Sequence, residues 1–226
     1  MANPVAVIGR FGIGLKNHIV DITLLLAQAF YWIIVGPFIK KPPSRKNIFD
    51  QMVFAGVKSV LIVFFVSLFT GIVLAMQSAY QLERLGATMY VASLVAVSMA
   101  RELGPVLTAL VVAGRVGAAI TAELGTMQVT EQIEALQAIA LNPVRFLVVP
   151  RVIALLIMLP CLTIFSDFTG MLGGWLIGVM NLGITSGLYI NTTIKFLELK
   201  DVYTGIAKSF VFAAIISVIG CYMGLG

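Results

Sequence analysis

The sequence predicts an all-α integral membrane protein, on the evidence of its composition, its charge content and its long apolar runs. Of the 226 residues, 60% are hydrophobic and only 11% are charged, with a mean hydropathy of +1.03, whereas soluble domains carry roughly 25% charged residues. Several apolar runs approach or exceed the ~20 residues that a membrane-spanning helix needs. We expect one membrane domain over residues 1–226, with an N-terminal interfacial helix, about four to five transmembrane helices and a short cytoplasmic helix.

The first apolar run, Ile22 to Ile39, has two interpretations. As a span it would place earlier basic residues opposite the basic cluster that follows it, whereas an interfacial helix would keep all of them in the cytoplasm. We favour an interfacial helix over residues 1–43 that ends in a rigid elbow at Pro42 and Pro43. The basic cluster comprises Lys40, Lys41, Arg45 and Lys46. It is typical of a topology signal, so the net charge of +5 does not indicate nucleic-acid binding.

The clearest span is the uncharged run from Ser59 to Leu82, within a first transmembrane helix at 47–84. Lys58 precedes the run and Arg84 follows it, and the positive-inside rule places its start in the cytoplasm.

The second transmembrane helix is predicted over 88–126, and it is unusually long. At 1.5 Å per residue it would extend ~58 Å, well beyond a hydrocarbon core of ~30 Å. The helix must therefore tilt, kink at Pro105 or protrude into the cytoplasm. Arg101 and Glu102 lie inside its apolar part, where each ionisable side chain costs roughly 2.5 to 3.5 kcal/mol. They are either a polar gate or headgroup contact in a substrate path, or a structural ion pair with a neighbouring helix.

Small residues follow these charges at helical spacing. One row contains Gly114, Ala118 and Ala122, and the adjacent row contains Gly117, Thr121 and Gly125. Such rows let helices approach closely in lipid, either within one subunit or at a dimer interface. Arg115 and Glu123 lie among them, and the sequence leaves their partners open.

Residues 128–141 form an amphipathic pattern that predicts a helix on the cytoplasmic side, ended by Asn142 and Pro143. The next apolar stretch is interrupted by Asp167. It is either one long helix ending near Met180 or a hairpin that turns at Asp167. The last apolar block is predicted as a transmembrane helix over 197–224.

The sequence offers little for enzyme chemistry. His18 has no companion at metal-ligand spacing, and the chain contains neither a nucleophile elbow nor a P-loop of the form GxxxxGK[ST]. We therefore expect a non-catalytic subunit that holds no metal and no cofactor.

The segment from Arg101 to Leu136 closely resembles the signature of the MlaE (YrbE) permease family. The matching motifs are RELGP at 101–105, AGRVGAA at 113–119, TAELGTM at 121–127, TEQIEAL at 130–136 and NP at 142–143. The likeness is weaker but recognisable from about Asp50 to Gly226.

The resemblance implies a homodimeric permease of the bacterial inner membrane that moves phospholipids between membranes. A separate cytoplasmic ABC ATPase would bind and hydrolyse the ATP, and a periplasmic MCE-domain protein would complete the complex. It also implies that residues 145–180 form one long helix, which places Lys195 and Lys200 outside against the charge rule. We follow the family on this point, because the charge rule is statistical.

The resemblance also implies site residues. Arg101, Glu102 and Lys208 match polar residues that line the family's lipid cavity, and acyl chains would lie near Leu74, Met76 and Tyr80. Residues 128–141 match the coupling helix, which docks in a groove of the ATPase; the contact residues would be Glu131, Gln132, Ile133, Glu134 and Leu136. Family members continue past the position of Gly226 into a final span, so we expect either that this sequence is a fragment of a longer protein or that its last helix is absent.

Two other functions remain open from the residues alone. A secondary transporter or channel would use the intramembrane charges Arg101, Glu102 and Asp167, although inverted repeats are not visible. A membrane scaffold without transport activity would tolerate reversal of the charge at Glu102.

Overall fold

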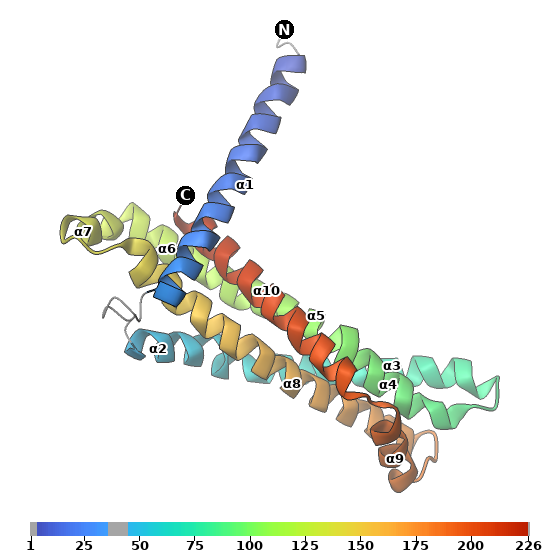
Figure 1. The fold of residues 1–226 in the computed structure, drawn as a ribbon. Coiled ribbons are helices and arrows are strands. Elements are labelled where there is room, and N and C mark those ends of the chain that lie inside the picture. Colours follow the sequence, from blue (N-terminus) through green and yellow to red (C-terminus); the bar gives the residue numbers. More distant parts are fainter. Residues whose placement is uncertain (1–3, 36–44, 226) are drawn as a thin grey trace. The chain divides into compact units, whose positions relative to one another are not determined.

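The computed structural model describes residues 4–35 and 45–225, and every regular element in these ranges is a helix. The α-helices are α1 (Pro4–Val35), α2 (Arg45–Ala55), α3 (Val60–Glu83), α4 (Val91–Ser98), α5 (Gly104–Val112), α6 (Ala118–Val129), α7 (Gln132–Ala138), α8 (Val149–Met180), α9 (Ser186–Phe196) and α10 (Leu199–Leu225) (Figure 1). The 3₁₀ helices are η1 (Val57–Ser59) and η2 (Thr88–Tyr90), and the π-helices are η3 (Met99–Leu103), η4 (Ala113–Gly117) and η5 (Val144–Val148).

Four helical stretches among the described residues are long and apolar enough to cross a membrane, which confirms the predicted all-α membrane fold. They are Lys46–Glu83, Thr88–Val129, Val144–Met180 and Leu199–Leu225. The third continues through Asp167 without a turn, so the hairpin alternative is wrong. Asp167 is only 6% exposed, which means that helix packing rather than a water-exposed loop surrounds its carboxyl group.

The N-terminal helix α1 has a shorter apolar part, Val20–Ile34, and it remains our prediction that this helix lies at the membrane interface. The predicted elbow at Pro42 and Pro43 lies outside the described residues, as do Lys40 and Lys41.

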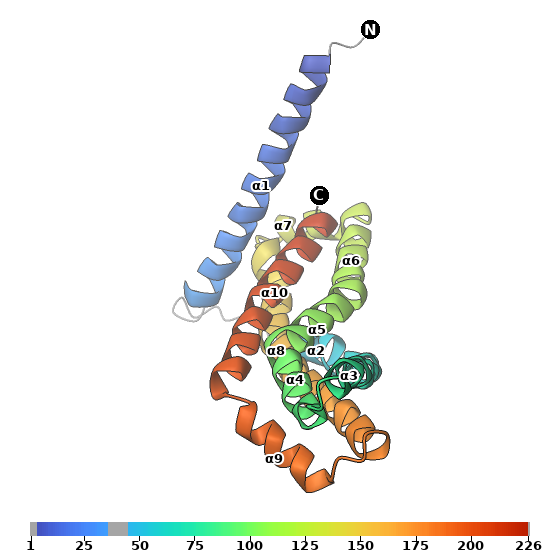
Figure 2. The same ribbon diagram turned by 90° about the vertical axis from the view of Figure 1, so that its right-hand side faces the viewer.

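The chain divides into two compact units. The first unit comprises the described parts of Met1–Gln51, Gly117–Ile153 and Ile215–Gly226, and the second comprises Met52–Val116 and Ala154–Ala214. Within the second unit, the short helix α9 follows α8 and precedes α10 (Figure 2).

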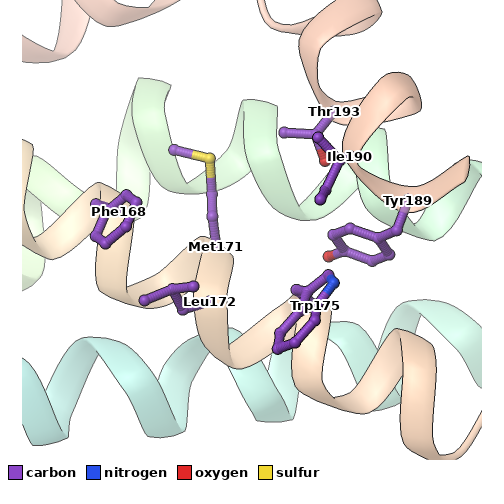
Figure 3. Close-up of a pocket in the computed structure, with 7 residues that line it drawn as sticks. All are labelled: Phe168, Met171, Leu172, Trp175, Tyr189, Ile190 and Thr193. Atoms are coloured by element: carbon purple, nitrogen blue, oxygen red, sulfur yellow. The ribbon is translucent and has the colours of Figure 1, made fainter. Parts of the chain in front are cut away.

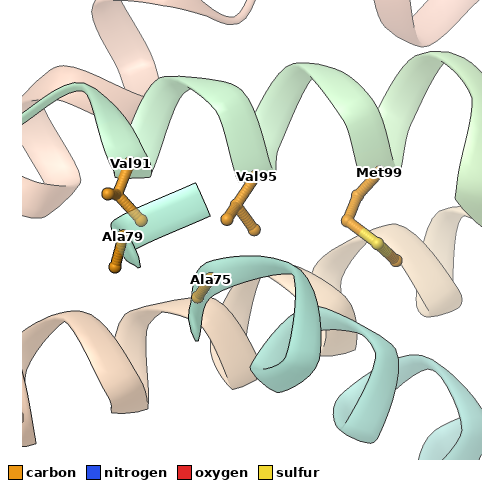
Figure 4. Close-up of a cluster of buried hydrophobic side chains, with 5 residues drawn as sticks. All are labelled: Ala75, Ala79, Val91, Val95 and Met99. Atoms are coloured by element: carbon orange, nitrogen blue, oxygen red, sulfur yellow. The ribbon is translucent and has the colours of Figure 1, made fainter. Parts of the chain in front are cut away.

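The second unit has an apolar cluster where α3 meets α4 and η3. Ala75 and Ala79 of α3 face Val91, Val95 and Met99, and all five are at most 4% exposed (Figure 4). The alanine side chains are small, so the backbones can approach while the larger side chains of the facing helix fill the space.

In the second unit, α3 and α8 approach even more closely, through glycine. A Cβ atom on Gly71 would lie 1.9 Å from the carbonyl oxygen of Gly170, and one on Gly173 would lie 2.3 Å from that of Leu68. The hydroxyl groups of Thr169 and Ser67 are 2.9 Å apart and hydrogen-bonded across the same contact. Small residues and polar pairs of this kind associate helices in lipid, where burial of apolar surface supplies little driving force.

In the first unit, the predicted row of Gly117, Thr121 and Gly125 faces α10. The Thr121 hydroxyl donates to the Gly220 carbonyl oxygen over 2.9 Å, and a Cβ on Gly224 would lie 2.7 Å from the Leu124 Cβ. This row therefore has contacts with α10 of the same chain, and its role at a dimer interface stays a prediction.

The first unit also holds a buried arginine. Arg151 is 4% exposed; its Nη2 lies 2.8 Å from Glu123 Oε2, and its Nη1 donates to the Leu147 carbonyl oxygen over 2.8 Å. The sequence had left the partner of Glu123 open.

We expect the substitution Glu123→Ala to lower the free energy of unfolding by about 1.5–3 kcal/mol, the range for a hydrogen bond to a charged group. The loss stays below the ~3–5 kcal/mol of a fully buried pair because the Glu123 side chain is 51% exposed. Thermal unfolding in detergent measures the effect. Glu83→Ala, which removes an exposed glutamate at the end of α3, is the control; equal Tm values for the two variants would contradict the prediction.

Candidate functional site

A cluster of four charged side chains in the second unit is the candidate functional site. Lys208 Nζ of α10 lies 2.6 Å from Glu102 Oε2 of η3, and Arg101 Nη1 lies 3.9 Å from Asp201 Oδ1. Arg101 and Glu102 are neighbours in sequence yet have different partners, because adjacent residues on a helix point in different directions. The structure thus brings together Arg101, Glu102 and Lys208, and adds Asp201 to them.

Local backbone structure exposes a carbonyl group to this cluster. Pro105 has no N–H, so the turn before it lacks one hydrogen bond, and the π-helix η3 occupies that turn. Lys208 Nζ donates to the Arg101 carbonyl oxygen over 3.0 Å. The lysine therefore supplies a donor in the turn where proline removes one, and π-helical turns are frequent at functional sites.

Gly205 lets α10 approach this turn. A Cβ on Gly205 would lie 2.1 Å from the Ala100 carbonyl oxygen and 3.2 Å from Pro105 Cγ. Because the first of these atoms belongs to the backbone, no side-chain movement can relieve the contact. The distance from Lys208 to η3 therefore depends on the absence of a side chain at position 205.

We expect Gly205→Ala to destabilise the protein by ~1–3 kcal/mol through overpacking, which lowers the Tm by roughly 2–4 °C per kcal/mol in a chain of this size. Gly187→Ala is the matched control, because a Cβ on Gly187 would meet no atom within 4 Å. Thermal unfolding of both variants in detergent checks the prediction, and a Tm unchanged by Gly205→Ala would contradict it.

Three of the four charged side chains in this cluster are not buried among the described residues, whereas that of Asp201 is only 13% exposed. The side chains of Arg101 and Glu102 are 56% and 60% exposed, and that of Lys208 is 33% exposed. The span that contains Arg101 begins at Thr88, 13 residues earlier. Because this separation is about 20 Å along a helix, Arg101 lies far from the N-terminal end of the span. Charges at that depth are costly against lipid tails, and they normally face a cavity or a partner.

The three predicted acyl-chain residues lie on α3 and have different environments. Met76 and Tyr80 are exposed, at 50% and 63%, and the Tyr80 ring packs against the guanidinium of Arg84 at 4.6 Å. Leu74 is half-buried and packs against the cluster of Figure 4, as does Leu103. Met76 and Tyr80 thus share an exposed face, whereas Leu74 belongs to the core.

Arg115 occupies a second polar site that the sequence left open. Its Nη1 donates to the Phe54 carbonyl oxygen over 3.2 Å and to the Ser59 hydroxyl over 2.6 Å, and its guanidinium lies 5.4 Å from the centre of the Phe54 ring. Ser59 is fully buried. This arginine joins η4 to the turn between α2 and α3.

The other predicted packing residues are exposed. Gly114 has no atom within 4 Å of where a Cβ would lie, and both Gly114 and Ala118 are exposed. No helix among the described residues therefore packs closely against Gly114 and Ala118.

The predicted cytoplasmic helix over 128–141 is shorter than expected. α6 extends to Val129, the backbone of Glu131 is left-handed with φ 57°, and α7 covers only Gln132–Ala138. The sequence pattern missed this break because the left-handed residue is a glutamate rather than the usual glycine or asparagine.

The predicted coupling residues divide between two environments. Ile133 is buried and Leu136 is half-buried, whereas Glu131, Gln132 and Glu134 are exposed. Beneath α7 lies a cleft of about 500 Å³ lined by Ile133, Glu134, Asn142, Pro143 and Leu225, among others.

Beyond these residues the segment exposes apolar side chains. Val129 is 85% exposed, Ile139 66% and Leu141 38%. Ile139 and Leu141 lie outside the candidate spans, whereas Val129 ends one of them. Exposed apolar side chains that gather into a patch outside a membrane are typical of a site for another protein.

Comparison with known proteins agrees with the motifs. Residues 48–226 match the family described as Permease MlaE. A probable ABC transporter permease protein of Rickettsia typhi is 45% identical over 195 residues, which cover 86% of this chain and 75% of that protein. The Synechocystis protein described in the same words is 42% identical, over 92% of this chain and 78% of its own length. The intermembrane phospholipid transport system permease protein MlaE of Haemophilus influenzae is 36% identical, over 93% and 82%.

Proposed function

Because this chain belongs to the MlaE family of ABC transporter permeases, we propose that it moves phospholipids between the inner and outer membranes of a bacterium. A separate cytoplasmic ATPase hydrolyses the ATP, and this chain binds neither nucleotide nor metal. The chain is a multi-pass membrane protein, and its proposed place is the bacterial inner membrane.

The cluster of Arg101, Glu102, Asp201 and Lys208 is the observation that supports a phospholipid substrate. A headgroup phosphate is an anion. In a site of low dielectric constant it is attracted to Arg and Lys side chains more strongly than it is in water. The exposed Met76 and Tyr80 offer an apolar face of α3 for acyl chains. A substrate with a charged head and apolar tails matches these two surfaces.

The exposed charges also support a homodimer. Two solvent-accessible ionisable side chains within a span need a cavity wall that the described residues of one chain do not supply. A second copy is the proposed wall, and the exposed Gly114 and Ala118 allow a helix to approach closely.

The exposed apolar side chains near α7 support docking of the cytoplasmic ATPase. The predicted contacts, Glu131, Gln132, Ile133, Glu134 and Leu136, lie in or beside this helix. A periplasmic MCE-domain protein is the remaining proposed partner, in keeping with the phospholipid transport system named for the Haemophilus relative.

Reconstitution tests the proposal. The permease, its ATPase and its MCE-domain partner are placed in liposomes that contain a fluorescent phospholipid, with acceptor vesicles outside. We expect transfer that requires ATP and stops when the catalytic glutamate of the ATPase is replaced. Transfer at the same rate without ATP, or with liposomes that lack the permease, would contradict the proposal.

A gradient-driven transporter is the second candidate, and it is favoured by Asp167. This residue is 6% exposed, and its Oδ1 has no hydrogen-bond partner among the described residues. If Asp167 carries a coupling proton, Asp167→Asn abolishes transport driven by a pH gradient in liposomes without ATPase. We expect no such transport from the unmodified protein.

A further inference from the structure

A pocket in the second unit lies away from the charged cluster's residues, between the end of α8 and the short helix α9. Its volume is about 370 Å³, within the range of small-molecule sites. Figure 3 shows side chains of both helices converging on it. They include Phe168, Leu172 and Trp175 of α8, and Tyr189, Ile190 and Thr193 of α9.

The wall of the pocket is apolar. The indole N–H of Trp175 already donates to the Ser186 hydroxyl over 3.1 Å, so the tryptophan presents its ring to the pocket. Phe168, Leu172 and Ile190 carry no polar side-chain atom. Such a wall favours an aliphatic or aromatic occupant.

Two hydroxyl groups at the wall have no hydrogen-bond partner within the described ranges. Tyr189 is 3% exposed, and neither its hydroxyl nor that of Thr193 is hydrogen-bonded there. A buried polar group without a partner costs ~1–3 kcal/mol. The occupant is therefore expected to carry hydrogen-bond acceptors beside its apolar part.

Tyr189 cannot easily turn its hydroxyl elsewhere, because its ring lies against two glycines of α8. A Cβ on Gly178 would lie 2.6 Å from the ring, and one on Gly174 would lie 2.8 Å from the hydroxyl oxygen. Burial raises the pKa of Tyr189 to about 12, so the hydroxyl keeps its proton at physiological pH and can donate.

Several side chains that line the pocket are exposed, and two of them belong to a candidate span. Phe168 and Leu172 belong to the span Val144–Met180, and they are 60% and 39% exposed, while Ile190 is 47% exposed. Apolar side chains exposed on a span contact acyl chains. The hydroxyl-bearing wall lies on α9, which is outside the spans.

We propose that this pocket binds one acyl chain of a membrane glycerolipid, whose ester carbonyl oxygens accept hydrogen bonds from the hydroxyls of Tyr189 and Thr193. An ester carbonyl is a free acceptor. The backbone carbonyls of a transmembrane helix are paired within that helix, so a partner helix satisfies these hydroxyls less well. The site would exist whether or not the protein transports phospholipids.

Photo-crosslinking tests the site. The assembled permease complex is placed in nanodiscs of phosphatidylethanolamine and phosphatidylglycerol that contain phosphatidylethanolamine with a diazirine on one acyl chain. After irradiation, mass spectrometry measures the labelling of peptides from 168–175 and 189–193. We expect these peptides to be labelled above other lipid-exposed segments.

A matched pair of variants separates pocket lipid from bulk lipid. Leu172→Trp fills the pocket, and Leu176→Trp is the control, because Leu176 has the same 39% exposure one turn later on α8 and does not line the pocket. We expect Leu172→Trp to reduce the labelling of 189–193 about tenfold, and Leu176→Trp to leave it unchanged. Equal labelling in both variants would overturn the proposal.

The hydrogen bonds between the hydroxyls and the ester carbonyls are tested by changing the protein and the lipid in combination. Tyr189→Phe is expected to weaken labelling by the ester lipid about fivefold, the equivalent of one hydrogen bond, with Tyr203→Phe on α10 as control. An ether-linked analogue lacks the carbonyl acceptors of both hydroxyls and should label the unmodified protein about twenty-fivefold less than the ester lipid does. It should label the Tyr189→Phe variant as strongly as it labels the unmodified protein. Equal labelling by ester and ether lipids would overturn the assigned role of the hydroxyls.

Discussion

The substitution Lys208→Glu is expected to reduce ATP-dependent phospholipid transfer at least about tenfold, while the complex still assembles. It places a carboxylate beside Glu102, removes the donor to the Arg101 carbonyl oxygen and repels an anionic headgroup. Two unit charges 4 Å apart interact by ~4 kcal/mol at an effective dielectric constant of 20. Reversal of one of them therefore exceeds the 1.36 kcal/mol that changes a rate tenfold.

The expected effect on folding is much smaller. The Glu102 and Lys208 side chains are 60% and 33% exposed, and exposed ion pairs contribute ~0–1 kcal/mol to stability. Lys200→Glu is the matched control, since it reverses an exposed lysine on the same helix two turns away. Transfer by the Lys208→Glu variant at the rate of the Lys200→Glu control would contradict a role in the substrate path.

A variant in which both charges are reversed distinguishes a role of the ion pair in helix packing from a role in headgroup binding. Glu102→Lys combined with Lys208→Glu keeps an ion pair and the net charge. We expect transport to remain low, because the cation that faces the headgroup has moved from α10 to η3. Full recovery would instead assign the pair to helix packing alone, as would normal transport after Glu102→Arg.

The substitution Ile139→Asp is expected to weaken binding of the ATPase about thirtyfold, which corresponds to the ~2 kcal/mol of an interface hot spot. Ile139 is 66% exposed although it is a large apolar residue outside the spans. A carboxylate at this position would have to lose its hydration inside a protein interface. Co-purification of the ATPase with the tagged permease measures the effect.

Ile194→Asp is the control for this prediction, because Ile194 is 69% exposed and lies on another helix outside the spans, α9. ATPase recovery should be unchanged by Ile194→Asp. If both variants retain the ATPase equally, the segment that follows α7 does not dock it.

The positions of the spans could be predicted from sequence because hydropathy is a local property. The prediction of 47–84 agrees with Lys46–Glu83, and 88–126 agrees with Thr88–Val129 to within three residues. The break at Glu131 could not be predicted, because the apolar period continues across it and glutamate seldom has a left-handed backbone.

The interaction partners of the charged side chains could be predicted only in part. Arg101 and Glu102 are conspicuous as charges in an apolar helix, and the resemblance added Lys208. Asp201 was missed because it lies near the end of its span, where charge is ordinary. The bond from Arg115 to Phe54 was missed because a backbone carbonyl leaves no trace in a sequence, and the bond to Ser59 was missed because a single serine 56 residues away does not indicate an arginine partner.

The glycine contacts between α3 and α8 limit how the second unit can move. Where the backbone of Gly71 meets that of Gly170, no layer of side chains remains that could change rotamers and let one helix slide over the other. Sliding would force carbonyl groups past each other, and packed contacts of this kind have discrete rather than continuous arrangements. The two helices should therefore move as one rigid body during a transport cycle. Any rearrangement should occur between helices that contact each other through longer side chains.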